Sequence, residues 1–100
     1  RDNPNEIARM RAVLEKMSAD AYAACCGAVR DYDARAEIAA IRAPTLVIGG
    51  TLDVSTPSSD ARFIVEHVAG ARYVELASGH LSNIEQPADF LAALIGHLAA

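Results

Sequence analysis

The run Thr45-Leu46-Val47-Ile48 constrains most strongly what this chain can fold into. It is apolar and continuous rather than alternating, with Pro44 before it and Gly49-Gly50 after it. A strand that is apolar on both faces is typical of a parallel sheet with helices on each side. A second candidate strand covers residues 72–76. The sequence therefore predicts an α/β fold with parallel strands.

From residue 44 onward the predicted order is strand, loop, helix, strand, loop, helix. The first of these helices is predicted over residues 58–69, where apolar residues recur at helical spacing, and Gly70 follows as its C-cap. The last helix is predicted to begin at Pro87. This order is a βαβα unit, whose right-handed crossover makes the strands parallel. Because two parallel strands do not form a covered sheet alone, the pattern implies more strands than the chain contains.

The first forty residues are predicted to be helical. Apolar residues at three- and four-residue steps predict an amphipathic helix over residues 3–17. A second helix is expected from an N-cap at Ser18 or Asp20, and a short third helix over residues 34–40. We therefore expect two parts, a helical segment at residues 1–40 and the βαβα part at residues 41–100.

Asp53 and His80 are the candidate catalytic residues, because each follows a predicted parallel strand. Both loops then leave the sheet at its carboxyl-end edge, where ligands gather in open α/β folds. A carboxylate bonded to one imidazole nitrogen leaves the other nitrogen as a base, which is two-thirds of a nucleophile–histidine–acid triad. Taken singly, an Asp in a loop is most often a turn residue and a His in a loop a surface group. Their shared placement after strands favours the catalytic interpretation.

Charge and cysteine content narrow the classes of partner. Lys and Arg number 9 against 13 Asp and Glu, the net charge is -4, and the basic residues form no stripe. Nucleic acid and anionic membrane are therefore not expected as partners.

The two cysteines, Cys25 and Cys26, are adjacent and lack the spacing of a zinc site. Unpaired thiols without an export signal favour the cytoplasm.

Two segments resemble α/β-hydrolases. Ala43-Pro44-Thr45-Leu46-Val47-Ile48-Gly49-Gly50-Thr51-Leu52-Asp53, with Thr56-Pro57 behind it, resembles the segment that carries the triad acid. Gly79-His80-Leu81-Ser82-Asn83-Ile84-Glu85-Gln86-Pro87 resembles the segment that carries the triad histidine. The order Asp before His agrees with that fold. Within the superfamily, residues 21–26, with Arg30-Asp31 and Asp33, are similar to the 3-oxoadipate enol-lactonases.

The resemblance implies the C-terminal part of an α/β-hydrolase: the end of the helical cap, then the last two strands with flanking helices. The G-x-S-x-G nucleophile elbow of that fold is absent from these residues. No serine has glycine two positions away on both sides, the serines being Ser18, Ser55, Ser58, Ser59, Ser78 and Ser82. The implied parent is a serine hydrolase of 3-oxoadipate enol-lactone in aromatic catabolism, and this chain alone is expected to be inactive. His80 would be the base and Asp53 would orient it.

The resemblance implies no metal or organic cofactor. The lactone substrate is small and anionic, so a nearby arginine is expected. The candidates are Arg30, Arg35 and Arg42, although each also fits a solvated helix-face residue.

Other functions stay open at this point. Dehalogenases, C–C bond hydrolases and esterases of the same fold share the acid and histidine positions, and the nucleophile discriminates among them. A non-enzymatic α/β interaction module is a further alternative. An unpaired strand edge and apolar helix faces at 3–17 and 58–69 also predict self-association.

Overall fold

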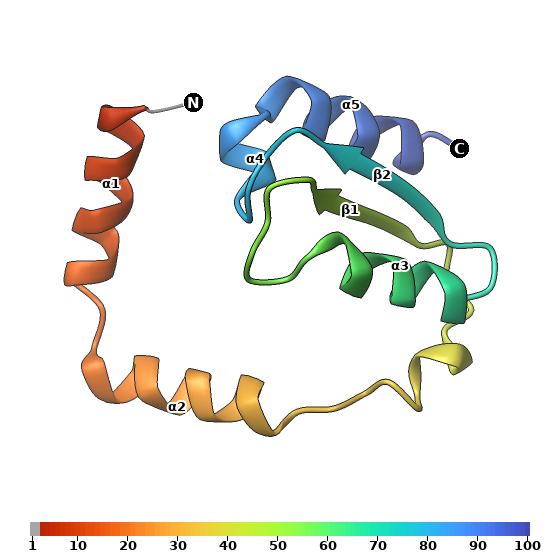
Figure 1. Ribbon diagram of the computed structural model, residues 1–100, viewed down its shortest axis with the longest axis horizontal. Coiled ribbons are helices and arrows are strands. Elements are labelled where there is room, and N and C mark those ends of the chain that lie inside the picture. The colour runs from red at the N-terminus through yellow and green to blue at the C-terminus, as the bar shows by residue number, and fades with distance from the viewer. Residues whose placement is uncertain (1–2) are drawn as a thin grey trace. The chain divides into compact units, whose positions relative to one another are not determined.

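The computed structural model describes residues 3–100 and divides the chain into two compact units, Arg1–Ala34 and Arg35–Ala100 (Figure 1). Residues 35–40 thus belong with the second unit, where the short helix η1 (Ile38–Ala40) contacts helix α3 (Ser58–His67). The assignment of residues 1–40 to a cap stays a prediction.

The first unit consists of two helices that begin where the sequence predicted. Helix α1 spans Pro4–Glu15, and the Asn3 side chain accepts a hydrogen bond from the backbone N–H of Glu6 at 3.2 Å. Helix α2 spans Ala19–Asp31, and Ser18 Oγ accepts from the N–H of Ala21 at 3.3 Å. These caps satisfy N–H groups that have no partner within a helix. Cys25 and Cys26 lie on α2, and both are exposed.

The predicted helix over residues 34–40 is wrong for most of its length. Residues 35–37 form a turn, and only a single 3-10 turn, η1 (Ile38–Ala40), follows. The residue before η1, Glu37, gives no side-chain cap. A segment this short gains too few hydrogen bonds to offset helix nucleation, despite its favourable alanines.

Two parallel strands form the sheet of the second unit, as predicted. β1 spans Leu46–Gly50 and β2 spans Arg72–Leu76. They pair in register from Leu46 opposite Arg72 to Gly50 opposite Leu76. Both strands therefore end at the same edge of the sheet.

Helices α3 and α5 cover opposite faces of this sheet. α3 (Ser58–His67) lies on the face of Glu75, whose Oε1 accepts a hydrogen bond from Ser58 Oγ at 2.7 Å. α5 (Pro87–Leu98) lies on the face of Arg72, whose guanidinium lies 3.2 Å from His97 Nδ1. Successive residues of a strand point to opposite faces, so Arg72 and Glu75, three positions apart on the same strand, point to opposite faces of the sheet. The two helices that they contact therefore lie on opposite faces. Figure 1 shows the resulting order of helix, sheet and helix.

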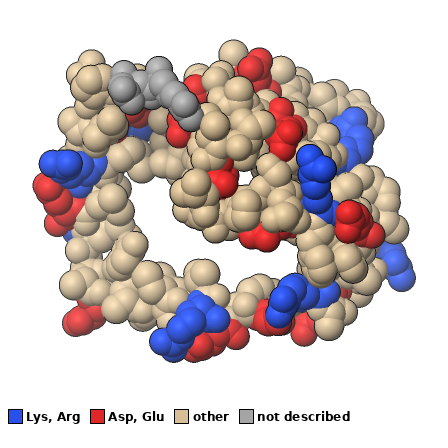
Figure 2. All heavy atoms as spheres, in the orientation of Figure 1, with Lys and Arg blue, Asp and Glu red and all other residues tan. Residues whose placement is uncertain are grey.

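The crossover from β1 to β2 ends with a left-handed residue. Gly70 has φ 73°, a conformation in which a side chain is disfavoured. The prediction of a helix over 58–69 capped by Gly70 is wrong at this end, because α3 ends at His67 and Val68 is its C-cap. The core of the described residues is small: Val68 and Leu76 are its buried apolar side chains. On the face shown in Figure 2, acidic and basic side chains are interspersed, and neither sign forms a continuous stripe.

Candidate active site

Two loops meet at the carboxyl ends of β1 and β2. The first loop carries Asp53 and the second carries His80. The N–H of Thr51 donates to the Leu76 carbonyl at 2.9 Å, and the N–H of Leu52 donates to the Ser78 carbonyl at 2.9 Å. The strand pairing therefore continues into the loops. This pairing brings together Asp53 and His80, which lie 27 positions apart in sequence.

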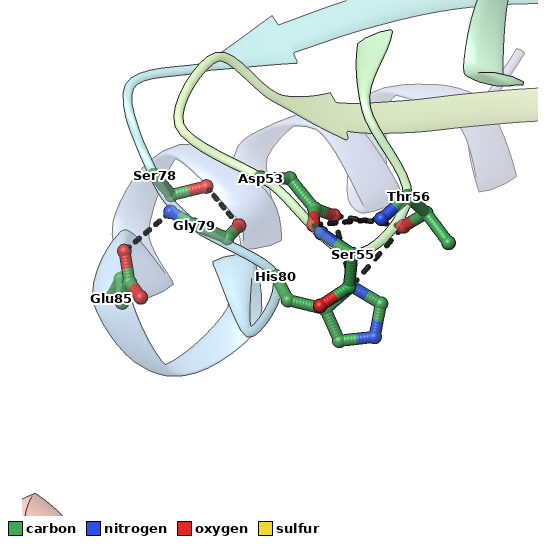
Figure 3. Close-up of polar contacts among 7 residues, drawn as sticks. All are labelled: Asp53, Ser55, Thr56, Ser78, Gly79, His80 and Glu85. Carbon is green, nitrogen blue, oxygen red and sulfur yellow. Dashed lines mark hydrogen bonds and ion pairs between the residues drawn. The ribbon is translucent and has the colours of Figure 1, made fainter. Parts of the chain in front are cut away.

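The Asp53 carboxylate accepts four hydrogen bonds. Its Oδ1 accepts from the backbone N–H groups of Ser55 at 2.9 Å and Thr56 at 3.0 Å. Its Oδ2 accepts from Thr56 Oγ1 at 2.8 Å and lies 2.8 Å from His80 Nδ1 (Figure 3). Four donors match the four lone-pair sites of a carboxylate. Hydrogen bonds to both oxygens therefore fix the orientation of the Asp53 carboxylate.

These donors hold the pKa of Asp53 far below its usual range. The largest cause is the backbone N–H of Thr56, followed by the hydrogen bond with His80. Burial raises the pKa and offsets part of this, while the Thr56 hydroxyl and the Ser55 N–H lower it further. Asp53 is therefore ionised at neutral pH, and an ionised carboxylate only accepts hydrogen bonds.

This ionisation fixes the tautomer of His80. Because Asp53 Oδ2 can only accept, the nitrogen 2.8 Å from it, Nδ1, carries the proton. In the neutral ring Nε2 is then the nitrogen with a free lone pair. Figure 3 shows that nitrogen directed away from Asp53 and Thr56. The side chain of His80 is 57% exposed and that of Asp53 7% exposed. The base is thus accessible, and the acid behind it is covered.

Gly50, the last residue of β1, permits the close approach of the two loops. A Cβ placed there would lie 2.5 Å from the Ser78 carbonyl oxygen and would also collide with that of Gly79. Ser78 is fully buried, and its Oγ donates to the Gly79 carbonyl at 3.2 Å. Only glycine therefore fits between the strand and the loop that carries His80.

Side chains from the following short helix and from the residue after it hold the His80 loop. Helix α4 spans Ser82–Glu85 and was not predicted, since four residues give no readable periodicity. Glu85 accepts a hydrogen bond from the N–H of Gly79 at 2.6 Å. Gln86 Nε2 donates to the Ala77 carbonyl at 3.1 Å. The loop is thus fixed on each side of Ser78, immediately before His80.

The candidate arginines lie in different places. Arg30 is on α2, and its guanidinium pairs with Asp31 at 2.8 Å. Arg35 lies in the turn before η1. Arg42 precedes β1, at the opposite end of that strand from Asp53. A role in substrate binding for any of them stays a prediction.

Two further kinds of feature are absent from residues 3–100. No group of three or more His, Cys, Asp and Glu side chains there is placed to hold a metal ion. Within the same residues, no helix combines the length and the apolar character that crossing a membrane requires.

Sequence reasoning assigned no role to Thr56, Glu85 or Ser55. The pattern Asp53-Val54-Ser55-Thr56 is a readable signal, because an Asp side chain commonly bonds N–H groups two residues on. The contact between Glu85 and Gly79 depends on the fold of α4 and has no comparable signal in the sequence.

The chain is similar to known enol-lactonases in sequence and in structure. No protein-family model matches the chain. The chain is 36% identical over 89 residues to 3-oxoadipate enol-lactonase 2 of Acinetobacter baylyi, an alignment that covers 89% of this chain and 33% of that protein. The chain thus spans about a third of the length of the curated relative.

Two solved structures match nearly the whole chain. A hydrolase from Pseudomonas aeruginosa PA01 matches with a TM-score of 0.93 and 42% identity, over 100% of this chain and 37% of that one. The enol-lactonase from Burkholderia xenovorans LB400 matches with a TM-score of 0.95 and 36% identity, over 97% of this chain and 37% of that one.

Proposed function

We propose that Asp53 and His80 are the acid and base of a serine hydrolase. The premise is that this chain resembles the C-terminal part of an α/β-hydrolase of the enol-lactonase kind. The observation that carries the proposal is the contact between His80 Nδ1 and Asp53 Oδ2 at 2.8 Å. An accessible base with a covered acid behind it is the arrangement that activates a nucleophile.

In the proposed reaction His80 Nε2 accepts the proton of a serine hydroxyl as the serine attacks the lactone carbonyl. Asp53 stabilises the imidazolium that forms and keeps the ring oriented. The ring-opening leaving group is an enolate, which departs readily and takes the proton from the His80 imidazolium, so that His80 is neutral again. His80 then accepts a proton from water as the water oxygen attacks the acyl carbonyl, and it returns that proton to the serine oxygen when the acyl group leaves.

The nucleophile of this reaction is proposed to lie outside these residues. None of the serines of this chain stands in a G-x-S-x-G sequence, the form that places a nucleophile on a strand-to-helix turn. Ser78, one of the two serines that lie two positions from His80, is fully buried and bonds the Gly79 carbonyl. We therefore expect no turnover by the 100-residue chain alone.

The proposed substrate is 3-oxoadipate enol-lactone, in cytoplasmic breakdown of aromatic compounds. The support is similarity to two enol-lactonases, one in sequence and one in structure. A neutral ester, a C–C hydrolase substrate and a haloalkane represent the other reactions of this fold, since fold alone does not fix substrate.

The test is an assay of the complete protein with these four substrates. We expect the enol-lactone to give the highest kcat/KM. His80→Ala should lower kcat on the order of 10⁶-fold, the loss that removing the triad histidine causes in subtilisin. His97→Ala is the control, because His97 lies on α5 beside the first residue of β2. Turnover of the lactone that survives His80→Ala would contradict the proposal.

A further inference from the structure

The imidazole of His80 has little packing to hold it in place. Its side chain is 57% exposed, whereas the Asp53 side chain is 7% exposed. An exposed ring attached by rotatable bonds samples several rotamers unless hydrogen bonds restrict it. One bond to Asp53 fixes a single point of the ring and leaves its direction to other contacts.

Thr56 supplies a second contact at the same nitrogen. Its Oγ1 lies 3.1 Å from His80 Nδ1 and 2.8 Å from Asp53 Oδ2. The hydroxyl has one proton, which it donates to Asp53, so its lone pairs are left for the ring N–H. The Nδ1–H thus faces two acceptors, a carboxylate oxygen and a hydroxyl oxygen.

We propose that Thr56 is a positioning residue, whose hydroxyl shares the Nδ1–H of His80 with Asp53 and so holds the ring with Nε2 outward. The proposal rests on the proposed function of His80 as a base. In the other tautomer, the lone pair of Nδ1 would face the carboxylate oxygen. The hydroxyl would then have to leave Asp53 to donate to the ring.

The surroundings of Thr56 make it suited to this task. Its backbone N–H bonds Asp53 Oδ1 at 3.0 Å while its hydroxyl bonds Oδ2, so one residue contacts both oxygens of the acid. It is followed by Pro57, the N-cap of α3, whose carbonyl accepts from the N–H of Asp60 at 2.8 Å. Thr56 is therefore attached to a helix that packs on the sheet.

The test compares two substitutions in the complete protein. Thr56→Val keeps the shape of the side chain and removes the hydroxyl, while Thr56→Ser keeps the hydroxyl and removes the methyl group. Thr51→Val, in the same loop, is the control. Nitrogen-15 NMR of the His80 ring is recorded at increasing pH until the ring signals stop changing and the ring is neutral. The spectra report the tautomer and the solvent exchange of the Nδ1–H.

We expect Thr56→Val to speed exchange of the Nδ1–H about tenfold and to lower kcat about tenfold with KM within about twofold. Thr56→Ser should restore most of both. Unchanged exchange in Thr56→Val, or a Thr56→Ser variant as impaired as Thr56→Val, would overturn the proposal. Faster exchange without any lactone hydrolysis by the wild type supports the positioning role and contradicts only the proposed function.

Discussion

His80 Nδ1 lies 2.8 Å from Asp53 Oδ2, although the two residues come from separate loops 27 positions apart in sequence. Their side chains differ in exposure, 57% for His80 and 7% for Asp53. The loops that carry them follow paired strands, and Gly50, Glu85 and Gln86 fix how the loops meet. The geometry of the pair thus depends on contacts outside it.

Gly50→Ala should destabilise the second unit and separate the loops. The added Cβ would collide with the Ser78 and Gly79 carbonyl oxygens, and such overpacking costs about 1–3 kcal/mol. Gly96→Ala is the matched control, because a Cβ at that position of α5 meets nothing within 4 Å. Helix propensity favours that control by up to about 1 kcal/mol. Urea unfolding measures both, and equal effects would show that the Gly50 contact is unimportant.

Acid should weaken the fold partly through Asp53. The pKa of Asp53 is lowered on folding, so its contribution to stability is full above its unfolded value of about 3.9 and is lost as pH falls below it. Asp53→Asn should therefore reduce stability at neutral pH but lose less than the wild type between about pH 5 and pH 2. The measurement is the free energy of unfolding across this range. Parallel curves for the two proteins would contradict the prediction.

Glu75 should account for another part of the acid sensitivity. Hydrogen bonds from the Ser58 and Tyr73 hydroxyls lower its pKa, aided by the charge of Arg62 and opposed by burial. Its contribution has the same sign and is likewise lost in acid. Glu75→Gln should therefore reduce the loss of unfolding free energy as pH falls, and this effect should add to that of Asp53→Asn.

Glu85→Ala should lower kcat without removing any group that touches substrate. The Gly79 N–H loses its 2.6 Å acceptor, and the loop before His80 becomes free to move. We expect a loss of about tenfold, since small displacements of a catalytic group are costly. Glu85→Gln retains an acceptor oxygen and should preserve most of the rate. A Gln variant as slow as the Ala variant would indicate that charge, rather than the hydrogen bond, matters.

The 100-residue chain should self-associate. The Thr45 carbonyl and the Thr51 N–H bond residues of β2, and backbone groups of successive residues point to opposite edges of a strand. The N–H and C=O groups of Leu46 and Ile48 therefore point to the other edge of β1. Leu91, Ile95 and Leu98 on α5 are also exposed. We expect sedimentation at roughly tens of micromolar to show a dimer, with the Ile48 amide increasingly protected from exchange as concentration rises. A monomer at that concentration would contradict this proposal.

The sequence predicted the parts of the fold that depend on local pattern. The continuous apolar run at 45–48 located the parallel strand Leu46–Gly50, whereas Gly70 lies three positions beyond His67, where α3 ends. From the two loop positions, the proximity of Asp53 and His80 followed. The roles of Thr56 and Glu85 did not, because they depend on how the loops fold against each other. The predicted helix over residues 34–40 was wrong because the helix propensity of this segment was not matched by a cap or by sufficient length.

The most direct test of the account is the rate of enol-lactone hydrolysis by Asp53→Asn in the complete protein. An amide at this position can present its NH₂ group to His80 and favour the wrong tautomer. We expect kcat to fall about 10⁴-fold, as for the same change in a serine protease triad, with the fold retained. Asp60→Asn, in the first turn of α3, is the control and should keep its rate. A folded Asp53→Asn variant within about tenfold of the wild-type kcat would contradict the central claim that Asp53 and His80 act as acid and base.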